Sequence, residues 1–169
     1  MGDRWAWCWP LVLFAAACGE QARSSAADQL EATAETSQEA EANELSLPRD
    51  TPPEQVLPLA QKRYAQGYVA EGPMITGELA RGGSSDHLLV LKTGVCYRVV
   101  GVGGEGVSDL DLLLYDPAGV QSNQDSGQDR FPVLGMQSEL CPPRGGAYRL
   151  QVQMYEGAGR FAVGLSRSQ

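Results

Sequence analysis

Five aspartates that lie close together in the sequence have the chemistry to bind a cation. Asp109, Asp111 and Asp116 fall within eight residues, and Asp125 and Asp129 follow in the next predicted loop. Carboxylate oxygens are hard ligands of the kind that Ca²⁺ takes. Asp109, Asp111 and Asp116 are therefore candidate calcium ligands, although their spacing is not that of an EF-hand. The alternative is that Asp109 and Asp111 are outward, solubilising charges on a strand.

The four cysteines divide into two groups. Cys8 lies inside an apolar N-terminal stretch and Cys18 directly follows it, which leaves Cys96 and Cys141 with one pairing open to them. An exported location would permit this disulfide. Closing a loop of about 46 residues would contribute about 4 kcal/mol in the chain-entropy model. The alternative is a pair of buried free thiols, and no zinc-ligand spacing is present.

The N-terminal stretch is typical of an export signal. Trp5 to Ala17 form an apolar run of about 13 residues, shorter than the roughly 20 that a membrane-spanning helix needs. Ala15, Ala16 and Ala17 lead directly to Cys18, and this order resembles the lipobox of bacterial lipoproteins. The resemblance implies that residues 1–17 are a lipoprotein signal peptide and that Cys18 is acylated. Ala15 stands where the lipobox usually has Leu, so a secreted protein without a lipid anchor is the alternative.

The charge of the chain limits its partners. A net charge of −8 disfavours nucleic-acid binding, which needs clustered Lys and Arg. The acidity is concentrated in residues 19–55, which are also rich in Ala, Ser and Thr. Such a composition buries too little apolar surface to fold alone. We predict that residues 18–56 form a disordered acidic linker between the anchor and the domain.

Residues 57–67 are predicted to form a short helix. Pro58 fits the first turn, where a missing N–H costs nothing, and Gly67 suits the C-terminal cap. Leu57, Ala60 and Tyr64 would share one face that docks on the domain. A helix that started further upstream, near Pro53, would be interrupted by Pro58.

Residues 74–166 read as an all-β domain. Apolar and polar residues alternate, so that Leu110, Leu112 and Leu114 would point inward while Leu113 and Tyr115 point outward with the aspartates. Strands spaced by about ten residues favour a sandwich or barrel. The eight predicted strands cover residues 74–80, 86–92, 95–102, 109–115, 119–124, 133–141, 147–154 and 159–166. Asp116 to Gly119 would form a turn.

The strand motifs resemble those of the bacterial pre-peptidase C-terminal (PPC) domain. The segments "SDLDLLLYDPAGV" and "GAYRLQV" match its D-x-D-x-x-L-Y-D-x-x-G and G-x-Y-x-L-x-V patterns. The resemblance implies a jelly-roll-like antiparallel β-sandwich, and some relatives bind calcium. PPC domains accompany secreted proteases and surface proteins, so a calcium-binding accessory domain of a protease or adhesion system is a further alternative.

Catalytic chemistry is not indicated. The single histidine, His87, follows Asp86 directly, and adjacent strand residues face opposite sides. Asp86 therefore would not orient His87 as a general base. The Gly-rich segment 101–106 joins two predicted strands, as a hairpin connection, and no helix N-terminus follows it for a phosphate.

The sequence thus predicts a non-enzymatic, lipid-anchored protein of the bacterial cell envelope. Its β-sandwich would be a binding or structural module without a cofactor, and its partner an unidentified envelope protein or glycan. Tyr97, Tyr115, Tyr155 and Phe131 are candidate contact residues.

Overall fold

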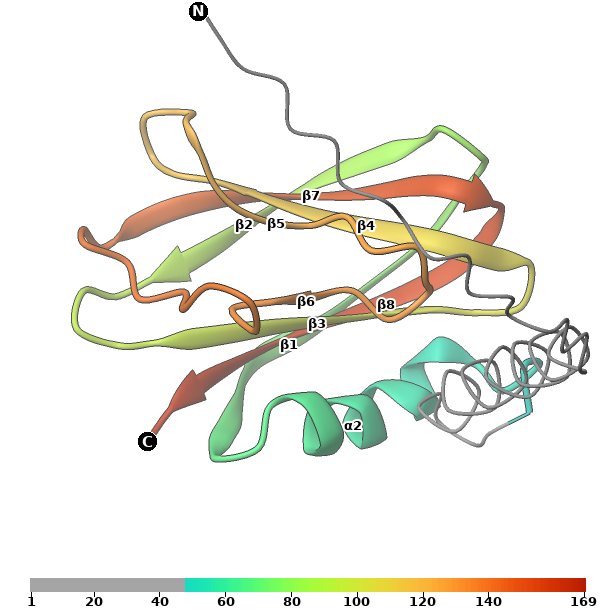
Figure 1. The fold of residues 1–169 in the computed structure, drawn as a ribbon, viewed down its shortest axis with the longest axis horizontal. Helices are drawn as coiled ribbons and strands as arrows, with labels where there is room; N and C mark the ends of the chain where they lie inside the picture. The colour runs from blue at the N-terminus through green and yellow to red at the C-terminus, as the bar shows by residue number, and fades with distance from the viewer. Residues whose placement is uncertain (1–47) are drawn as a thin grey trace, which may run out of the picture. The chain divides into compact units, whose positions relative to one another are not determined.

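The computed structural model describes residues 48–169, which fold as two four-stranded antiparallel sheets and one helix (Figure 1). Sheet A has the strand order β1-β8-β3-β6 and sheet B the order β2-β7-β4-β5. The elements are α2 (Pro53–Tyr64), β1 (Tyr68–Leu79), β2 (Ser84–Leu91), β3 (Tyr97–Gly103), β4 (Val107–Tyr115), β5 (Gln121–Asp125), β6 (Val133–Leu134), β7 (Gly146–Gly157) and β8 (Gly159–Ser168).

This strand order is that of an eight-stranded jelly roll, so the predicted fold class is confirmed. The chain changes sheet at most of its connections, and β4 to β5 is the hairpin within one sheet. That hairpin turns at Asp116 to Gly119, as predicted. Gly119 N donates to Asp116 O at 2.9 Å, and Gly119 has a φ of 81°, which glycine adopts without strain.

The main core lies between the sheets and is built by alternation. Leu110, Leu112 and Leu114 of β4 are buried there together with four residues of β7 at every second position. Those four are Tyr148, Leu150, Val152 and Met154. Because each apolar side chain contributes about 2 kcal/mol on burial, these two central strands fix the register of sheet B.

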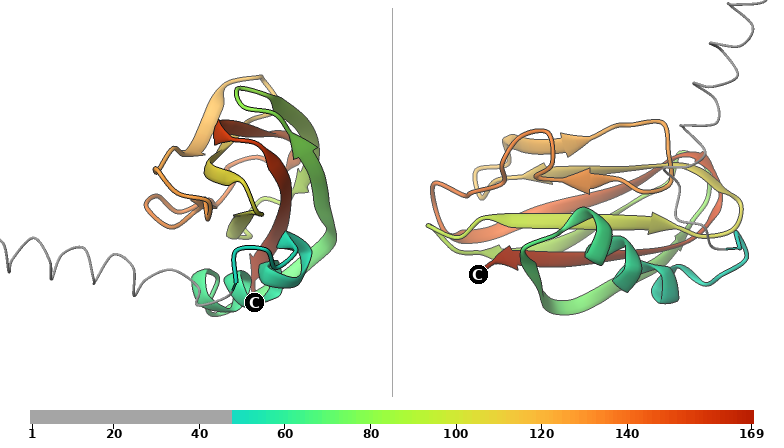
Figure 2. Two further views of the ribbon diagram at one scale, coloured as in Figure 1. Left: turned by 90° about the vertical axis from the view of Figure 1, so that its right-hand side faces the viewer. Right: turned by 60° about the horizontal axis from the view of Figure 1, so that its bottom comes forward.

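A second core lies on the outer face of sheet A, under α2 (Figure 2). Val56, Leu57 and Ala60 of the helix pack against Val100 and Val102 of β3. The outward residues of β8 beneath the helix are small, namely Ala162, Gly164 and Ser166. A Cβ on Gly164 would lie 2.6 Å from Nε2 of Gln61, and this nitrogen also donates to Ser166 Oγ at 3.0 Å. The small residues therefore let the helix approach the sheet closely.

The helix begins at Pro53, four residues before its predicted start, so residues 53–56 belong to it and not to the linker. Pro53 holds the first helical position, and Pro58 lies inside the helix, where the prediction expected an interruption. The packing of Val56 and Leu57 on sheet A offsets the backbone hydrogen bond that Pro58 lacks. Arg98 Nη1 donates to the Tyr64 carbonyl at 3.0 Å at the end of the helix.

Three predicted strand boundaries were wrong by more than two residues, and one predicted connection was wrong. β1 begins at Tyr68, six residues early, and a bulge between Glu71 and Ile75 lets it continue beside β8. β6 has two residues in place of nine, because the chain after Leu134 leaves the sheet. β7 runs on to Gly157. The glycine-rich segment 101–106 crosses from sheet A to sheet B and is not a hairpin.

The predicted signal peptide, Cys18 and the linker up to residue 47 lie outside the described residues. Within residues 48–169, no helix has the length and apolar character required to cross a membrane.

Candidate functional site

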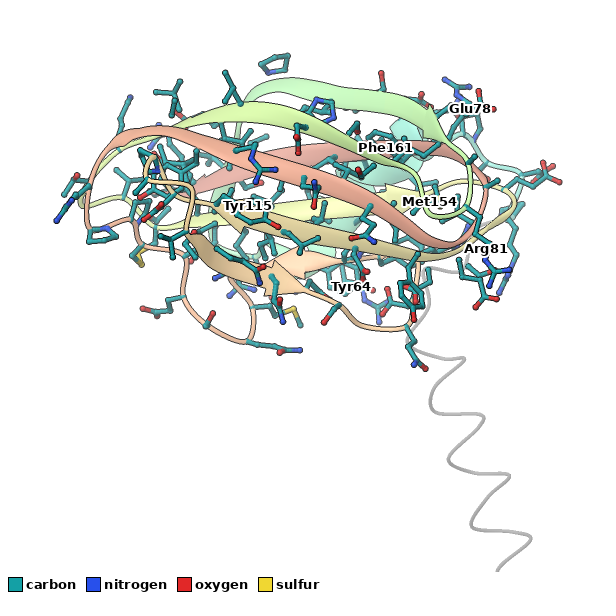
Figure 3. The ribbon with its side chains drawn as sticks, turned by 90° about the horizontal axis from the view of Figure 1, so that it is seen from above. Tyr64, Glu78, Arg81, Tyr115, Met154 and Phe161 are labelled. Atoms are coloured by element: carbon teal, nitrogen blue, oxygen red, sulfur yellow. A yellow bond between two sulfur atoms is a disulfide. The ribbon has the colours of Figure 1, made fainter. Side chains whose placement is uncertain are left out.

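The outer face of sheet B carries polar and aromatic side chains, and within residues 48–169 no helix covers it. Figure 3 looks onto this sheet, with Tyr115 labelled on β4. We call this surface the open face. It comprises the outward residues of the four strands, among them Asp86, Leu88, Leu113, Tyr115, Gln124, Arg149, Gln151 and Gln153, as the strand register places them.

Arg149 of β7 organises the middle of the open face. Its guanidinium carbon lies 3.9 Å from the centre of the Tyr115 ring on β4, and its Nη1 donates to Asp86 Oδ1 on β2 at 2.8 Å. Gln151 Nε2 donates to the same oxygen at 3.3 Å. The ion pair is partly exposed and contributes at most about 1 kcal/mol to stability. Its effect is to hold a planar cation and an aromatic ring in fixed positions on the surface.

The contact between Tyr115 and Arg149 was not predicted from the sequence. Tyr115 was predicted to point outward, and Arg149 is directly paired with it in the register of β4 and β7. Among the other predicted contact residues, Tyr155 is exposed, whereas Tyr97 and Phe131 are buried. The Tyr97 hydroxyl accepts a hydrogen bond from Lys92 N at 2.9 Å, which is a structural role.

The alternative interpretation of Asp109 and Asp111, as outward solubilising charges, was wrong about their exposure. Both lie at outward positions of β4, but their exposed fractions are 7% and 8%. The loop after β5 lies against them, with Leu110 N donating to Asp129 O at 3.0 Å. The loop after β5 thus covers Asp109 and Asp111, and the alternation of residues in β4 does not predict this cover.

The carboxyl groups of both residues titrate abnormally. Burial raises the pKa of Asp109, and the negative charges of Asp129, Glu156 and Asp125 raise it further. Burial, followed by the charges of Asp109 and Asp125, raises the pKa of Asp111 to about 6. Oδ1 of Asp109 is buried without a hydrogen-bond partner among the described residues. This corner of sheet B therefore concentrates negative charge that its protein surroundings leave partly uncompensated.

Asp116, the third candidate ligand, lies at the opposite end of β4 from Asp109. Its Oδ1 accepts hydrogen bonds from the backbone nitrogens of Ala118 and Val120, both at 2.9 Å, and so stabilises the β4–β5 turn. Asp125 and Asp129 likewise accept hydrogen bonds from backbone nitrogens, those of Val133 and Phe131 included. In residues 48–169 no group of three or more Asp, Glu, His or Cys side chains has a metal-binding arrangement. The structure thus brings Asp109 and Asp111 together but not Asp116.

His87 and Asp86 face opposite sides of β2, as predicted. The Asp86 carboxylate points to the open face and binds Arg149. The His87 ring packs edge-on against Phe161, and its Nε2 lies 2.9 Å from Ser85 Oγ. The contact between Ser85 and His87 was not predicted, although residues two apart on a strand share a face. Asp86 is therefore not the group that orients this imidazole.

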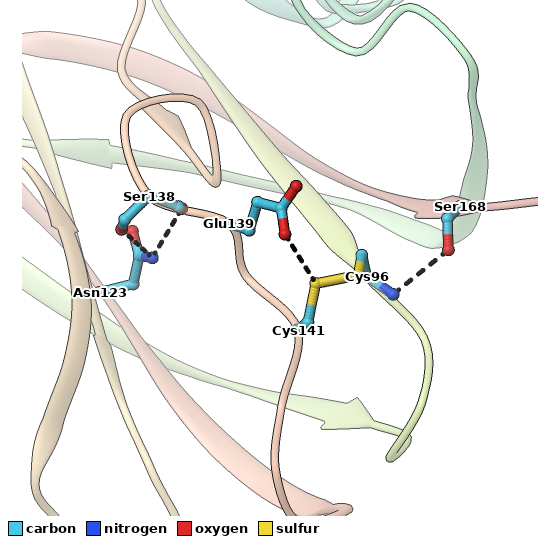
Figure 4. The surroundings of a disulfide bond; sticks show 6 residues. All are labelled: Cys96, Asn123, Ser138, Glu139, Cys141 and Ser168. Atoms are coloured by element: carbon cyan, nitrogen blue, oxygen red, sulfur yellow. Dashed lines mark hydrogen bonds between the residues drawn. A yellow bond between two sulfur atoms is a disulfide. The ribbon is translucent and has the colours of Figure 1, made fainter.

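The disulfide between Cys96 and Cys141 is present, and the predicted pairing is confirmed (Figure 4). It joins the chain just before β3 to the loop that leads into β7, over a sequence separation of 45 residues. Cys96 N donates to Ser168 Oγ at 3.2 Å, which ties the C-terminal end of β8 to the same point. Glu139 Oε2 lies 3.9 Å from Cys141 Sγ, a contact without a proton to share because the sulfur is oxidised.

An apolar groove of about 250 Å³ opens between the edge strands β1 and β2. Its floor is formed by residues of the main core, Leu89, Val99 and Val163 among them. Leu88 and Val90 of β2 and the bulge of β1 at Gly72 and Pro73 form its rim.

Neither a family model nor a curated protein matches the chain. Among solved structures, the chain is similar to PliG from Aeromonas hydrophila, a periplasmic inhibitor of g-type lysozyme. The sequence identity is 16%, the match covers 59% of this chain and 88% of that one, and the TM-score is 0.45. The resemblance to PPC domains and to lipoproteins stays a prediction.

Proposed function

We propose that this chain is a non-catalytic binding protein of the bacterial cell envelope, anchored through acyl groups on Cys18, and that its open face contacts an envelope protein. The observation that carries the proposal is the asymmetry of the two sheets. The outer face of sheet A is closed by α2, whereas that of sheet B presents Arg149 stacked on Tyr115. Arg and Tyr are among the residues that contribute most to protein–protein binding.

The disulfide supports the proposed location. Disulfides persist in oxidising compartments such as the periplasm and the cell surface, and Cys96 is bonded to Cys141 in this domain. The export signal and the lipobox supply the route. Several acyl chains on one residue would give stable attachment, so the folded domain would need no membrane-binding surface of its own.

The anchor is tested by fractionating cells that express the chain or its Cys18→Ser variant, followed by intact mass measurement. We expect the parent chain in the membrane fraction with added acyl mass, and the variant without acyl mass. A parent chain that is released with soluble proteins and carries no acyl mass would contradict the anchor and leave a secreted protein.

The partner surface is tested with a photo-crosslinking residue at Gln151 on the open face and, as a matched control, at Leu59 on the solvent side of α2. Leu59 is 46% exposed and lies on α2, which packs on the outer face of sheet A and not on sheet B. We expect a protein adduct from position 151 that is lost on Arg149→Glu, and none from position 59. An adduct to glycan alone, or one that Arg149→Glu leaves unchanged, would contradict a protein partner at this face.

Calcium binding is a second candidate function, favoured by the unpartnered Oδ1 of Asp109 and the buried Asp111 beside it. Burial and like-charge repulsion both raise the pKa of these carboxyls, and a bound cation would offset the cost of keeping them ionised. The test is thermal unfolding with added Ca²⁺ and with chelator. A higher midpoint in Ca²⁺ that Asp109→Asn removes is expected for a site, and identical midpoints would exclude it.

A further inference from the structure

β2 differs from the other edge strands in being both long and regular, with Asp86 as its one carboxylate. Free strand edges are normally blunted by bulges, prolines, charges or short length. β1 has a bulge with Pro73, β6 has two residues, and β5 has five residues and a register shift. β2 has eight residues, pairs with β7 without a shift, and contains neither proline nor lysine.

The side chains of β2 are apolar where they are most exposed. Leu88 and Val90 have exposed fractions of 73% and 70%, and both lie on the rim of the 250 Å³ groove. Exposed apolar residues beside an apolar groove form a contiguous patch, which in soluble proteins marks an interaction surface.

The backbone of β2 is also oriented for pairing. Gly83 O accepts a hydrogen bond from Met154 N of β7 at 2.9 Å. In an antiparallel ladder the N–H and C=O groups of successive residues point to opposite sides. The carbonyl of Gly83 and, in the regular register that follows, both groups of residues 85, 87 and 89 therefore point toward β7. Leu88 and Val90 direct theirs toward the free edge, next to their own exposed side chains.

We propose that β2 is a self-association edge, at which a second copy of this chain adds its own β2 antiparallel about a two-fold axis at Leu89. This register places Leu88 opposite Val90 of the second copy, so that the four exposed apolar side chains meet. It also places Asp86 opposite Lys92 of the second copy, twice by symmetry, and both residues are exposed.

The charges select this register. A two-fold axis at Leu88 would put Asp86 opposite Val90 of the second copy, and an axis at His87 would put Asp86 opposite Leu88. Only the axis at Leu89 joins apolar to apolar and carboxylate to ammonium. Opposite-charge pairs directly across an antiparallel ladder are favourable and like-charge pairs unfavourable. The paired strands would cover the groove and join two open faces into one continuous sheet.

The test is sedimentation equilibrium of the full chain in density-matched detergent over a wide range of concentration. We expect a concentration-dependent dimer for the parent chain and a monomer for Val90→Lys. The matched control is Val120→Lys, in the exposed β4–β5 turn at 63% exposure, which should dimerise like the parent chain. A monomeric parent chain, or a Val90→Lys variant that dimerises normally, would overturn the proposal.

The register is tested by charge substitution. Lys92→Glu should weaken dimerisation about tenfold, because each of two symmetric pairs becomes repulsive. The double variant Asp86→Asn with Lys92→Glu should restore much of it, because the amide at position 86 removes the repulsion and still accepts a hydrogen bond from Arg149. Near-UV circular dichroism confirms that each variant is folded. Loss of dimerisation in Lys92→Glu that the double variant fails to restore, or no loss at all, would overturn the register.

Discussion

The outer faces of the two sheets are built on the same alternating strand pattern, but one is covered by a helix and the other is exposed to solvent. Outward positions of β8 in sheet A carry Ala162, Gly164 and Ser166, and α2 covers them. Outward positions of β7 in sheet B carry Arg149, Gln151 and Gln153, and no helix of the described residues lies there. The residue types at every second position thus decide which face joins the core and which is left to bind.

The difference also separates stability from function. On sheet A, the apolar contacts of α2 add a second core to the domain. On sheet B, Arg149, Tyr115 and Asp86 interact at the surface, where ion pairs contribute little to folding. Substitutions on the two faces are therefore expected to change the free energy of unfolding by different amounts. Four measurements test this expectation.

Removing the disulfide should have the largest effect on stability. The bond connects the start of β3 in sheet A with the loop that enters β7 in sheet B. The double variant Cys96→Ser, Cys141→Ser should lose about 4 kcal/mol of unfolding free energy because its unfolded chain is no longer cross-linked. Urea unfolding measures this loss, and equal midpoints for parent and variant would show that the bond does not stabilise the pair of sheets.

The next effect should come from the covered face. Leu57→Ala leaves a cavity under α2, where Leu57 is fully buried, and should cost about 3 kcal/mol. Leu59→Ala, on the solvent side of the same helix, should change the unfolding free energy by less than about 0.5 kcal/mol. Similar losses for both variants in urea unfolding would mean that α2 is not held by its contact with sheet A.

The buried acidic corner of sheet B should respond to pH. Because the pKa of Asp111 is raised to about 6, the folded state keeps a proton that the unfolded state releases at lower pH. The contribution of Asp111 to the free energy of unfolding therefore falls as pH rises from about 4 to about 7. Asp111→Asn should be more stable than the parent chain at pH 7 and equal to it near pH 4. A stability difference independent of pH would refute the raised pKa.

The smallest effect on stability should come from the open face. Arg149→Ala removes a partly exposed ion pair and a stacking contact and should cost under about 1 kcal/mol in urea unfolding. A loss comparable to that of Leu57→Ala would show that Arg149 is chiefly structural and would weaken the assignment of this face to binding.

The sequence was sufficient to predict the sandwich, because the alternation in β4 and β7 is regular and the apolar residues at its inward positions are buried. It was insufficient where long-range contacts override local signals. Pro58 stays inside α2 because the helix packs on sheet A. β1 extends to Tyr68 because β8 is there to pair with it.

The candidate site was predictable only in part for the same reason. Cys96 and Cys141 pair as predicted, since two cysteines allow one bond. Asp109 and Asp111 are covered by a loop that follows β5, and nothing in the spacing of β4 indicates this. The stacking of Arg149 on Tyr115 depends on the register of strands more than 30 residues apart in sequence.

Single-cysteine labelling in intact cell envelopes tests whether the open face is the binding surface. Gln124→Cys places a thiol on the open face and Leu59→Cys places one on the outside of α2, while the native cysteines are acylated or oxidised under the proposed processing. We expect the thiol at position 124 to react more slowly with a soluble maleimide in the envelope than in the purified protein, because a bound partner covers it. The thiol at position 59 should react equally in both. Equal labelling of position 124 in the two settings, or protection of position 59 instead, would contradict it.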